Sequence, residues 1–191
     1  LLDKAKEKID KNITHFGELI TSETPLVGVE PSAILGFRDE YPRLADDKDT
    51  ARRIAPFTFT LEEFFHEEIK KGKISSSDFS DKKKTIKIHG HCHQKSLSNM
   101  ESSFAMLNLP KNYAVTIINS GCCGMAGSFG YEKEHYEVSM QVGEDTLFPK
   151  VRNTGKDVSI AAAGTSCRHQ IFDGTGRKAL HPATILREAL K

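Results

Sequence analysis

The sequence predicts an α/β protein built on doubly wound parallel sheets with helices on both faces. Two observations lead to this fold class. Short apolar runs rich in β-branched residues, typical of buried strands, alternate along the chain with segments of helical spacing. The strand-like runs are followed by a turn and then a helix, which is the order that makes parallel crossovers. At 191 residues the chain is long enough to bury a core without disulfide staples.

The first half opens with a charged segment whose apolar residues recur at spacings of three and four. These residues are Ala5, Ile9, Ile13, Phe16 and Ile20. They predict an amphipathic surface helix over 1–20. A short buried strand is expected at 25–29, followed by a helix from Pro31 to about Tyr41.

Further helices are expected before the middle of the chain. Residues 49–54 are compatible with one or two turns. Thr60 and Glu63 form a capping-box pattern that starts a helix ending near Gly72. The serine-, lysine- and aspartate-rich segment 73–84 is then expected to be an exposed link between two halves of one domain, about 1–72 and about 85–191.

The second half alternates more regularly. Predicted strands span 85–89, 113–119 and 157–163, and predicted helices span 94–107, 131–151, 165–172 and 183–190. This order is that of a Rossmann-like or flavodoxin-like sheet, in which ligands bind at the carboxyl ends of the strands.

Charge and hydropathy exclude several classes of function. Lys and Arg number 27 against 26 Asp and Glu, so the net charge of +1 gives no electrostatic basis for binding nucleic acid. The longest apolar runs are strand-sized, and the N-terminus lacks the apolar core of a signal peptide. We therefore expect a cytoplasmic chain without a transmembrane segment, with peripheral attachment to the inner membrane through an electron acceptor as a further expectation.

The four cysteines follow the predicted strands of the second half. Cys92 comes after the first strand, the adjacent pair Cys122 and Cys123 after the second, and Cys167 after the third. Because the carboxyl ends of parallel strands meet at one edge of a sheet, three loops should converge with four thiols between them. In a reducing compartment, such cysteines are typical of metal or redox sites.

Four thiolates suit either an iron–sulfur cluster or zinc, since both prefer soft sulfur ligands. Structural zinc usually takes closely spaced pairs such as C-x-x-C. Adjacent cysteines can each contact a different iron of one cluster but clamp a single zinc awkwardly, so the spacing favours a cluster. Buried, inert thiols are the remaining alternative.

Glycines and histidines surround these cysteines. Gly121, Gly124 and Gly127 allow close backbone approach and positive φ, and their N–H groups are candidate donors to a bound cofactor. His89, His91 and His93 alternate around Cys92, and His169 follows Cys167. Of these, we expect His91 and His93, with His169 as a further candidate, to line the pocket as ligands or proton donors.

Three motifs resemble a known family. They are His89-Gly90-His91-Cys92-His93-Gln94-Lys95, the stretch Cys122-Cys123-Gly124-Met125-Ala126-Gly127-Ser128-Phe129-Gly130-Tyr131, and Gly164-Thr165-Ser166-Cys167-Arg168-His169-Gln170. They look like the cysteine-rich CCG domain in the C-terminal part of FAD-linked D-2-hydroxyacid dehydrogenases. More distantly they resemble glycolate oxidase iron–sulfur subunits, anaerobic glycerol-3-phosphate dehydrogenase and heterodisulfide reductase.

The resemblance implies a role in passing electrons from reduced flavin to an acceptor that the sequence does not specify. It implies a [4Fe–4S] cluster held by the four cysteines. The partners implied are the flavin domain and the ferredoxin-like segment of the parent enzyme. Neither a flavin-binding segment nor a C-x-x-C-x-x-C run occurs in the chain, so we expect it not to oxidise a hydroxy acid alone.

The chain departs from the family pattern at two positions. Gln170 stands where the general pattern has the second cysteine of a C-x-x-C, and Ala33 stands where a repeated first half would carry a cysteine. We therefore expect a degenerate first half and one metal site. The alternatives are a zinc-bound docking module of the same enzyme, and a thiol redox protein that uses Cys122 and Cys123, whose adjacency would strain a disulfide.

Overall fold

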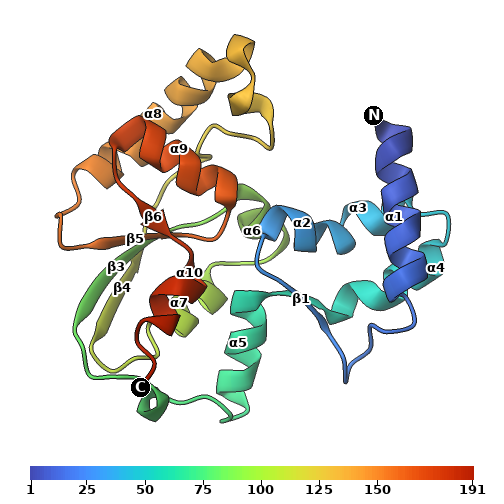
Figure 1. The fold of residues 1–191 in the computed structure, drawn as a ribbon, viewed down its shortest axis with the longest axis horizontal. Helices are drawn as coiled ribbons and strands as arrows, with labels where there is room; N and C mark the ends of the chain where they lie inside the picture. Colours follow the sequence, from blue (N-terminus) through green and yellow to red (C-terminus); the bar gives the residue numbers. More distant parts are fainter. The chain divides into compact units, whose positions relative to one another are not determined.

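The computed structural model describes all of residues 1–191. The chain folds into two compact units, Leu1–Leu61 and Glu62–Lys191, called here the first and second unit. Each unit contains helices and one parallel sheet (Figure 1). The sheet has two strands in the first unit and four in the second. The predicted α/β fold class is confirmed.

The first unit holds a two-stranded parallel sheet in which Leu26 pairs with Thr58. Its elements are α1 (Leu2–Phe16), β1 (Leu26–Gly28), α2 (Pro31–Ile34), the 3-10 turn η1 (Leu35–Phe37), α3 (Glu40–Leu44), α4 (Lys48–Ile54), η2 (Ala55–Phe57) and β2 (Thr58–Thr60). Helix α1 buries Ile9 and Ile13 as its spacing predicts, but it ends at Phe16. The next residue, Gly17, is a poor helix former whose carbonyl accepts a hydrogen bond from Arg53 at 3.0 Å.

The single helix predicted from Pro31 to Tyr41 is wrong. The segment forms α2, η1 and α3 instead, with Gly36 inside the 3-10 turn and Pro42 in the following helix. A glycine weakens a helix, and a proline has no N–H to continue one, so short pieces replace a long element.

The second unit is a four-stranded parallel sheet of order β4-β3-β5-β6. Its strands are β3 (Lys84–His89), β4 (Tyr113–Ile117), β5 (Ser159–Ala162) and β6 (Ala179–Leu180). Its helices are α5 (Leu61–Lys70), which begins at the boundary, then α6 (Cys92–Leu97), α7 (Glu101–Leu107), α8 (Tyr136–Arg152), α9 (Thr165–Thr175) and α10 (Pro182–Arg187), with 3-10 turns η3 (Ser76–Asp78), η4 (Phe129–Tyr131) and η5 (Lys133–His135).

Helices cover both faces of this sheet (Figure 1). One core cluster joins Ile86 and Ile88 of β3 to α7 and α10, and the other joins Ile160 and Ala162 of β5 to α8 and α9. Successive side chains of a strand point to opposite faces. His89, one position after Ile88, therefore belongs to the face covered by α8 and α9.

Two of the helices predicted in the second unit begin or break differently. The helix predicted over 94–107 is divided into α6 and α7, and the side chain of Asn99 accepts a hydrogen bond from Glu101 N at 2.9 Å at the break. This local bond offers the backbone an alternative to a continuous helix. Helix α8 begins at Tyr136 rather than 131, because Glu132 is extended between η4 and η5.

The segment 73–84 is not wholly exposed. Phe79 is 2% exposed in the core of the second unit, and Ser80 N donates to Ala189 O at 2.7 Å. The apolar Phe79 thus fixes part of a segment whose composition is otherwise polar. The interpretation of 1–72 as a degenerate repeat stays a prediction.

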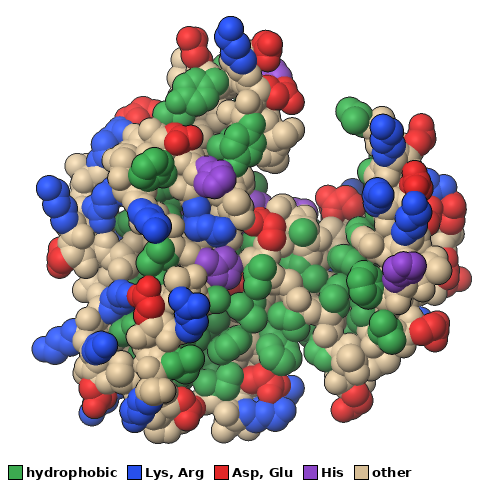
Figure 2. All heavy atoms as spheres, viewed as in Figure 1, with side chains coloured by type: hydrophobic (Ala, Val, Ile, Leu, Met, Phe, Trp, Pro, Cys, Tyr) green, Lys and Arg blue, Asp and Glu red, His purple; other side chains and the backbone are tan.

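No helix is long and apolar enough to cross a membrane. On the face shown in Figure 2, acidic and basic side chains are interspersed over each unit. This mixture matches the near-zero net charge of the sequence.

Candidate metal centre

The four cysteines lie in the second unit, in loops that leave the carboxyl ends of three neighbouring parallel strands. Cys92 opens α6 after β3, Cys122 and Cys123 lie in the loop after β4, and Cys167 lies in the first turn of α9 after β5. All four are free thiols. Cys123 and Cys167 are 4% and 2% exposed, whereas Cys92 is exposed and Cys122 half-buried. The site thus has a dry inner side and a side open to solvent.

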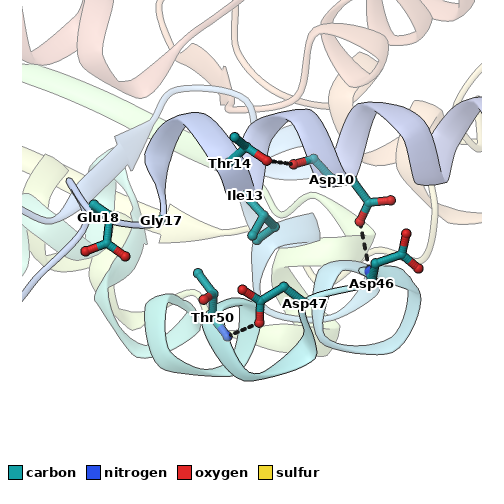
Figure 3. Close-up of a pocket in the computed structure, with 8 residues that line it drawn as sticks. All are labelled: Asp10, Ile13, Thr14, Gly17, Glu18, Asp46, Asp47 and Thr50. Atoms are coloured by element: carbon teal, nitrogen blue, oxygen red, sulfur yellow. Dashed lines mark hydrogen bonds between the residues drawn. The ribbon is translucent and has the colours of Figure 1, made fainter.

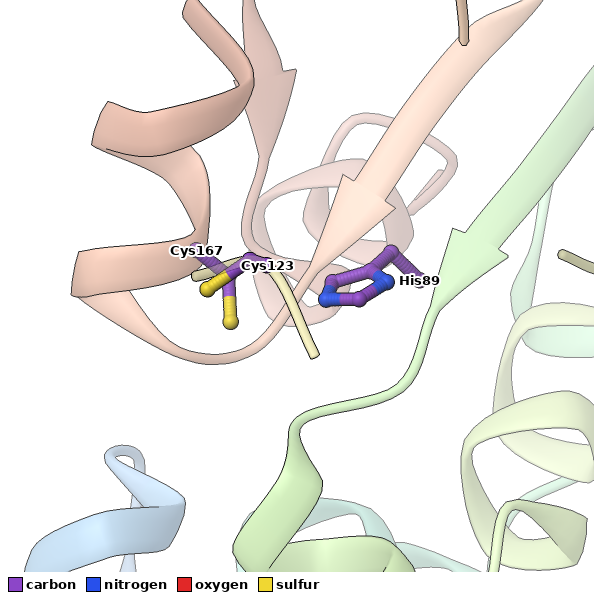
Figure 4. Close-up of side chains that lie close together, drawn as sticks. All are labelled: His89, Cys123 and Cys167. Atoms are coloured by element: carbon purple, nitrogen blue, oxygen red, sulfur yellow. The ribbon is translucent and has the colours of Figure 1, made fainter. Parts of the chain in front are cut away.

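The innermost group consists of two thiols and an imidazole. The ligand atoms of His89, Cys123 and Cys167 all lie within 4.8 Å of one another. Figure 4 shows the His89 ring, at the end of β3, turned toward the two sulfur atoms. Sulfur and neutral imidazole nitrogen together suit zinc and iron.

The four thiols form a chain of hydrogen bonds, which lowers the pKa values of two of them and raises those of the other two. Hydrogen bonding from Cys123 and then Cys92 holds the pKa of Cys122 well below its usual range. A hydrogen bond from Cys123 likewise lowers the pKa of Cys167 to about 5, and the neighbouring His89 acts in the same direction. The donors Cys92 and Cys123 have raised pKa values, chiefly through their hydrogen bonds to Cys122.

The hydrogen bonds therefore favour ionisation of Cys122 and Cys167 over ionisation of Cys92 and Cys123. Like charges this close disfavour further ionisation, and a bound cation removes that penalty. A backbone hydrogen bond also lowers the pKa of Cys122, since Gly124 N donates to Cys122 Sγ at 3.3 Å. This donor set fits a soft, thiolate-preferring metal or cluster.

His89 is a site residue that was not among the histidines expected to line the pocket. It is 1% exposed, its Nδ1 lies 2.9 Å from Ser120 Oγ, and its Nε2 is buried without a hydrogen-bond partner. The alternation of β3 carries the signal that was available. Ile86 and Ile88 face one core cluster, so His89 faces the other, where Cys123 and Cys167 lie.

Of the three histidines expected to line the pocket, His91 lies near Cys167 and helps to lower the pKa of that thiol, whereas His169 lies elsewhere. His91 is buried, and its Nδ1 accepts a hydrogen bond from His93 N at 3.2 Å as the N-cap of α6. His93 is half-buried on the same helix. His169 Nδ1 lies 2.7 Å from Tyr131 Oη in a separate pocket on α9. A ligand role for these three stays a prediction.

Of the three glycines, Gly124 has the most demanding backbone. Its φ is +98°, and a Cβ there would lie 2.0 Å from Ser139 O. Gly127 also has positive φ, at +70°, but with open space around it. Gly121 has no positive φ, so it does not use the backbone freedom that a glycine allows, and its N–H donates to Thr146 Oγ1 at 3.0 Å. Cofactor binding by these glycines stays a prediction.

The two positions that depart from the resembled motif pattern, Gln170 and Ala33, belong to different units. Gln170 is 1% exposed and donates from Nε2 to Ser139 O and Oγ, at 3.1 and 2.8 Å, tying α9 to α8. Ala33 is exposed on α2 of the first unit. Gln170 is therefore committed to packing the helices rather than to the thiols.

Arg168, beside Cys167, fastens the cysteine loop to the sheet. Its guanidinium donates to Ala162 O at 3.0 Å, to Ala163 O, and to Thr165 Oγ1 at 3.0 Å. These bonds span the end of β5 and the start of α9. Arg168 thus positions the turn that carries Cys167.

The first unit has a small acidic pocket of its own. Its lining includes Asp10, Glu18, Asp46 and Asp47 (Figure 3). Asp10 Oδ1 accepts a hydrogen bond from Asp46 N at 2.8 Å, and Asp47 Oδ1 accepts one from Thr50 N at 2.9 Å as the N-cap of α4. Two of these carboxylates therefore hold the local backbone.

Comparison with known proteins gives the context of these cysteines. A subunit of the anaerobic glycerol-3-phosphate dehydrogenase of Escherichia coli (strain K12) is 26% identical over 191 residues, which is 98% of this chain and 46% of the relative. This chain is similar to parts of larger dehydrogenases. D-2-hydroxyglutarate dehydrogenases are similar too, at 30% over 186 residues in Haemophilus influenzae and 26% over 181 in Pseudomonas putida.

The chain spans less than half the length of these relatives. The match with the Haemophilus influenzae enzyme covers 87% of this chain and 16% of that enzyme. The match with the Pseudomonas putida enzyme covers 92% of this chain and 16% of that enzyme. No family model and no solved structure matches the chain. The motif resemblance is confirmed to the extent that both kinds of dehydrogenase are relatives. The CCG domain itself stays a prediction.

Proposed function

We propose that this chain is the metal-bearing, electron-transferring part of a larger flavin-linked dehydrogenase that oxidises a 2-hydroxy acid. The observation that carries the proposal is the convergence of four free thiols at one edge of the parallel sheet. The dehydrogenase relatives, each longer than the chain, support it. The proposed partners are the flavin domain and a ferredoxin-like segment of the parent enzyme.

In this proposal Cys92, Cys122, Cys123 and Cys167 hold a [4Fe–4S] cluster, which when bound supplies one-electron chemistry. Buried Cys123 and Cys167 exclude water from the inner side. Exposed Cys92 holds the outer side close to the surface, where an electron donor or acceptor can approach. The positive end of α9 faces the Cys167 thiolate and stabilises its charge.

A second candidate is a zinc-bound docking module of the same enzyme without a redox role. Its supporting observation is the set of His89 beside Cys123 and Cys167, because a histidine joined by three cysteines is a common structural zinc site. In that case the metal would fix the three loops and the shape they present.

Anaerobic reconstitution with iron and sulfide tests the proposal. We expect about four irons per chain, as a [4Fe–4S] cluster requires, and loss of iron and visible colour in Cys123→Ser. Ser166→Ala, beside Cys167 but without a thiol, is the control and should keep both. Unchanged iron in Cys123→Ser would remove that residue from the ligand set. Stoichiometric zinc that iron cannot replace would favour the docking module.

A further inference from the structure

We infer that His89 binds the metal directly through Nε2, beside Cys123 and Cys167, as a ligand other than cysteine. The inference rests on the proposed metal site and changes its ligand set. A [4Fe–4S] cluster takes four protein ligands, so His89 would take the place of the exposed Cys92 beside the other three thiols. It comes from the geometry of one buried imidazole whose two nitrogens have different surroundings.

The Nδ1 side of the ring is fixed by Ser120. Nδ1 lies 2.9 Å from Ser120 Oγ, in the loop after the neighbouring strand β4. When Nδ1–H donates to that hydroxyl oxygen, Nε2 carries a lone pair. A metal-binding histidine commonly has its other ring nitrogen held in this way, which sets both tautomer and orientation.

The Nε2 side points to the thiols and has no other partner. It is fully buried and has no hydrogen bond of regular geometry. It lies within 4.8 Å of the sulfur atoms of Cys123 and Cys167, and His89 helps to lower the pKa of the Cys167 thiol. Buried polar atoms are nearly always satisfied, so an unpaired nitrogen aimed at two thiols indicates a metal ligand. A metal ion between the three atoms satisfies all of them.

The backbone that carries His89 is rigid. His89 pairs with Ala162 in the register of β3 and β5, and Ile88 O accepts a hydrogen bond from Ile118 N at 2.8 Å. The imidazole is therefore positioned by the centre of the sheet rather than by a loop. This preorganisation favours a ligand role.

Gln170 does not compete with His89 for the site. Its side chain bonds Ser139 on α8, so the position where the family pattern has another cysteine supplies no ligand. His89 reaches Cys123 and Cys167 from the end of β3. Neutral imidazole in place of thiolate makes the site less negative, which raises the reduction potential of a bound cluster.

Isotope labelling tests the inference on the unaltered chain. The protein is reconstituted anaerobically with iron and sulfide, reduced, and studied by pulsed electron paramagnetic resonance with natural and ¹⁵N-labelled histidine. We expect one strongly coupled nitrogen that changes with the label. Only weak coupling, as from an Nε2–H···S hydrogen bond, would overturn the ligand assignment.

Variants assign the nitrogen to one residue. His89→Ala should lose the strong coupling or the metal, and His89→Cys should regain metal without the coupling. His66→Ala, on α5 with its Nδ1 3.2 Å from Ser102 Oγ, is the matched control and should keep the coupling. Strong coupling that persists in His89→Ala would overturn the inference.

A zinc-loaded sample extends the test to the second candidate function. X-ray absorption should show a nitrogen at about 2.0 Å beside sulfurs at about 2.3 Å. Sulfur ligands alone, with iron or zinc, would overturn the role of His89 and leave the cysteine site standing. A chain that takes up neither metal would contradict both proposals.

Discussion

Gln170 donates two hydrogen bonds from Nε2 to Ser139, one to the carbonyl oxygen at 3.1 Å and one to Oγ at 2.8 Å. Both residues are almost fully buried, at 1% and 0% exposure. The pair joins α9, which carries Cys167, to α8. This contact therefore contributes both to the stability of the second unit and to the position of the helix that carries Cys167.

Replacing this amide should destabilise the second unit. Gln170→Leu leaves Ser139 O and Oγ buried without their donor, so we expect the free energy of unfolding to fall by about 1–3 kcal/mol. Urea denaturation measures it. Gln141→Leu, on the exposed side of α8, is the matched control and should change little. Equal midpoints for the two variants would show that the contact contributes nothing.

Gly124 should tolerate no side chain. A Cβ would meet Ser139 O at 2.0 Å, and φ is +98°, so Gly124→Ala combines a steric clash with backbone strain. We expect a loss of roughly 3 kcal/mol or more, against about 1 kcal/mol for Gly127→Ala, where space is open. Thermal unfolding compares the two. An Ala at 124 as mild as one at 127 would contradict the backbone described.

Arg168 should affect metal content without being a ligand. Arg168→Ala removes the bonds that hold the end of β5 to the start of α9, so Cys167 loses its fixed position. We expect iron uptake to fall several-fold while the chain stays folded by circular dichroism. Lys178→Ala removes an exposed positive charge nearby and should bind iron normally. Equal iron in both variants would limit Arg168 to a surface role.

Alanine substitutions in the strands should lower the free energy of unfolding in proportion to how deeply the replaced side chain is buried. Ile88 is 1% exposed, whereas its register partner Ile117 is 45% exposed. Ile88→Ala should cost about 2–5 kcal/mol of unfolding free energy, and Ile117→Ala roughly 1 kcal/mol. Urea denaturation of both variants checks the difference. A similar cost for the two would contradict the placement of β3 inside the sheet and of β4 at its edge.

The sequence predicted the features that depend on local pattern. The β-branched runs at β3, β4 and β5 located the central strands, and parallel topology then required their following loops, with Cys92, Cys122, Cys123 and Cys167, to leave the same edge. Strands β2 and β6 were not foreseen. Strand β2 has three residues of which two are threonine, and β6 has only two residues, so neither contains the apolar run that marked β1.

Other features depend on tertiary contacts and could not be read locally. Nothing in its neighbours indicates that Gln170 turns to Ser139, which lies 31 positions away. His89 was nearer to prediction, since the alternation of β3 sets its face. Its distance from Cys123 and Cys167 requires the register of β3 with β5, which pairs His89 with Ala162.

Metal content after anaerobic purification tests the central claim most directly. We expect wild-type chain to hold iron and sulfide near four each, with reversible one-electron reduction, and Cys123→Ser and Cys167→Ser to lose both. Zinc at one per chain that iron cannot displace, or a metal-free chain that cannot be reconstituted, would contradict the assignment of an electron-transferring centre.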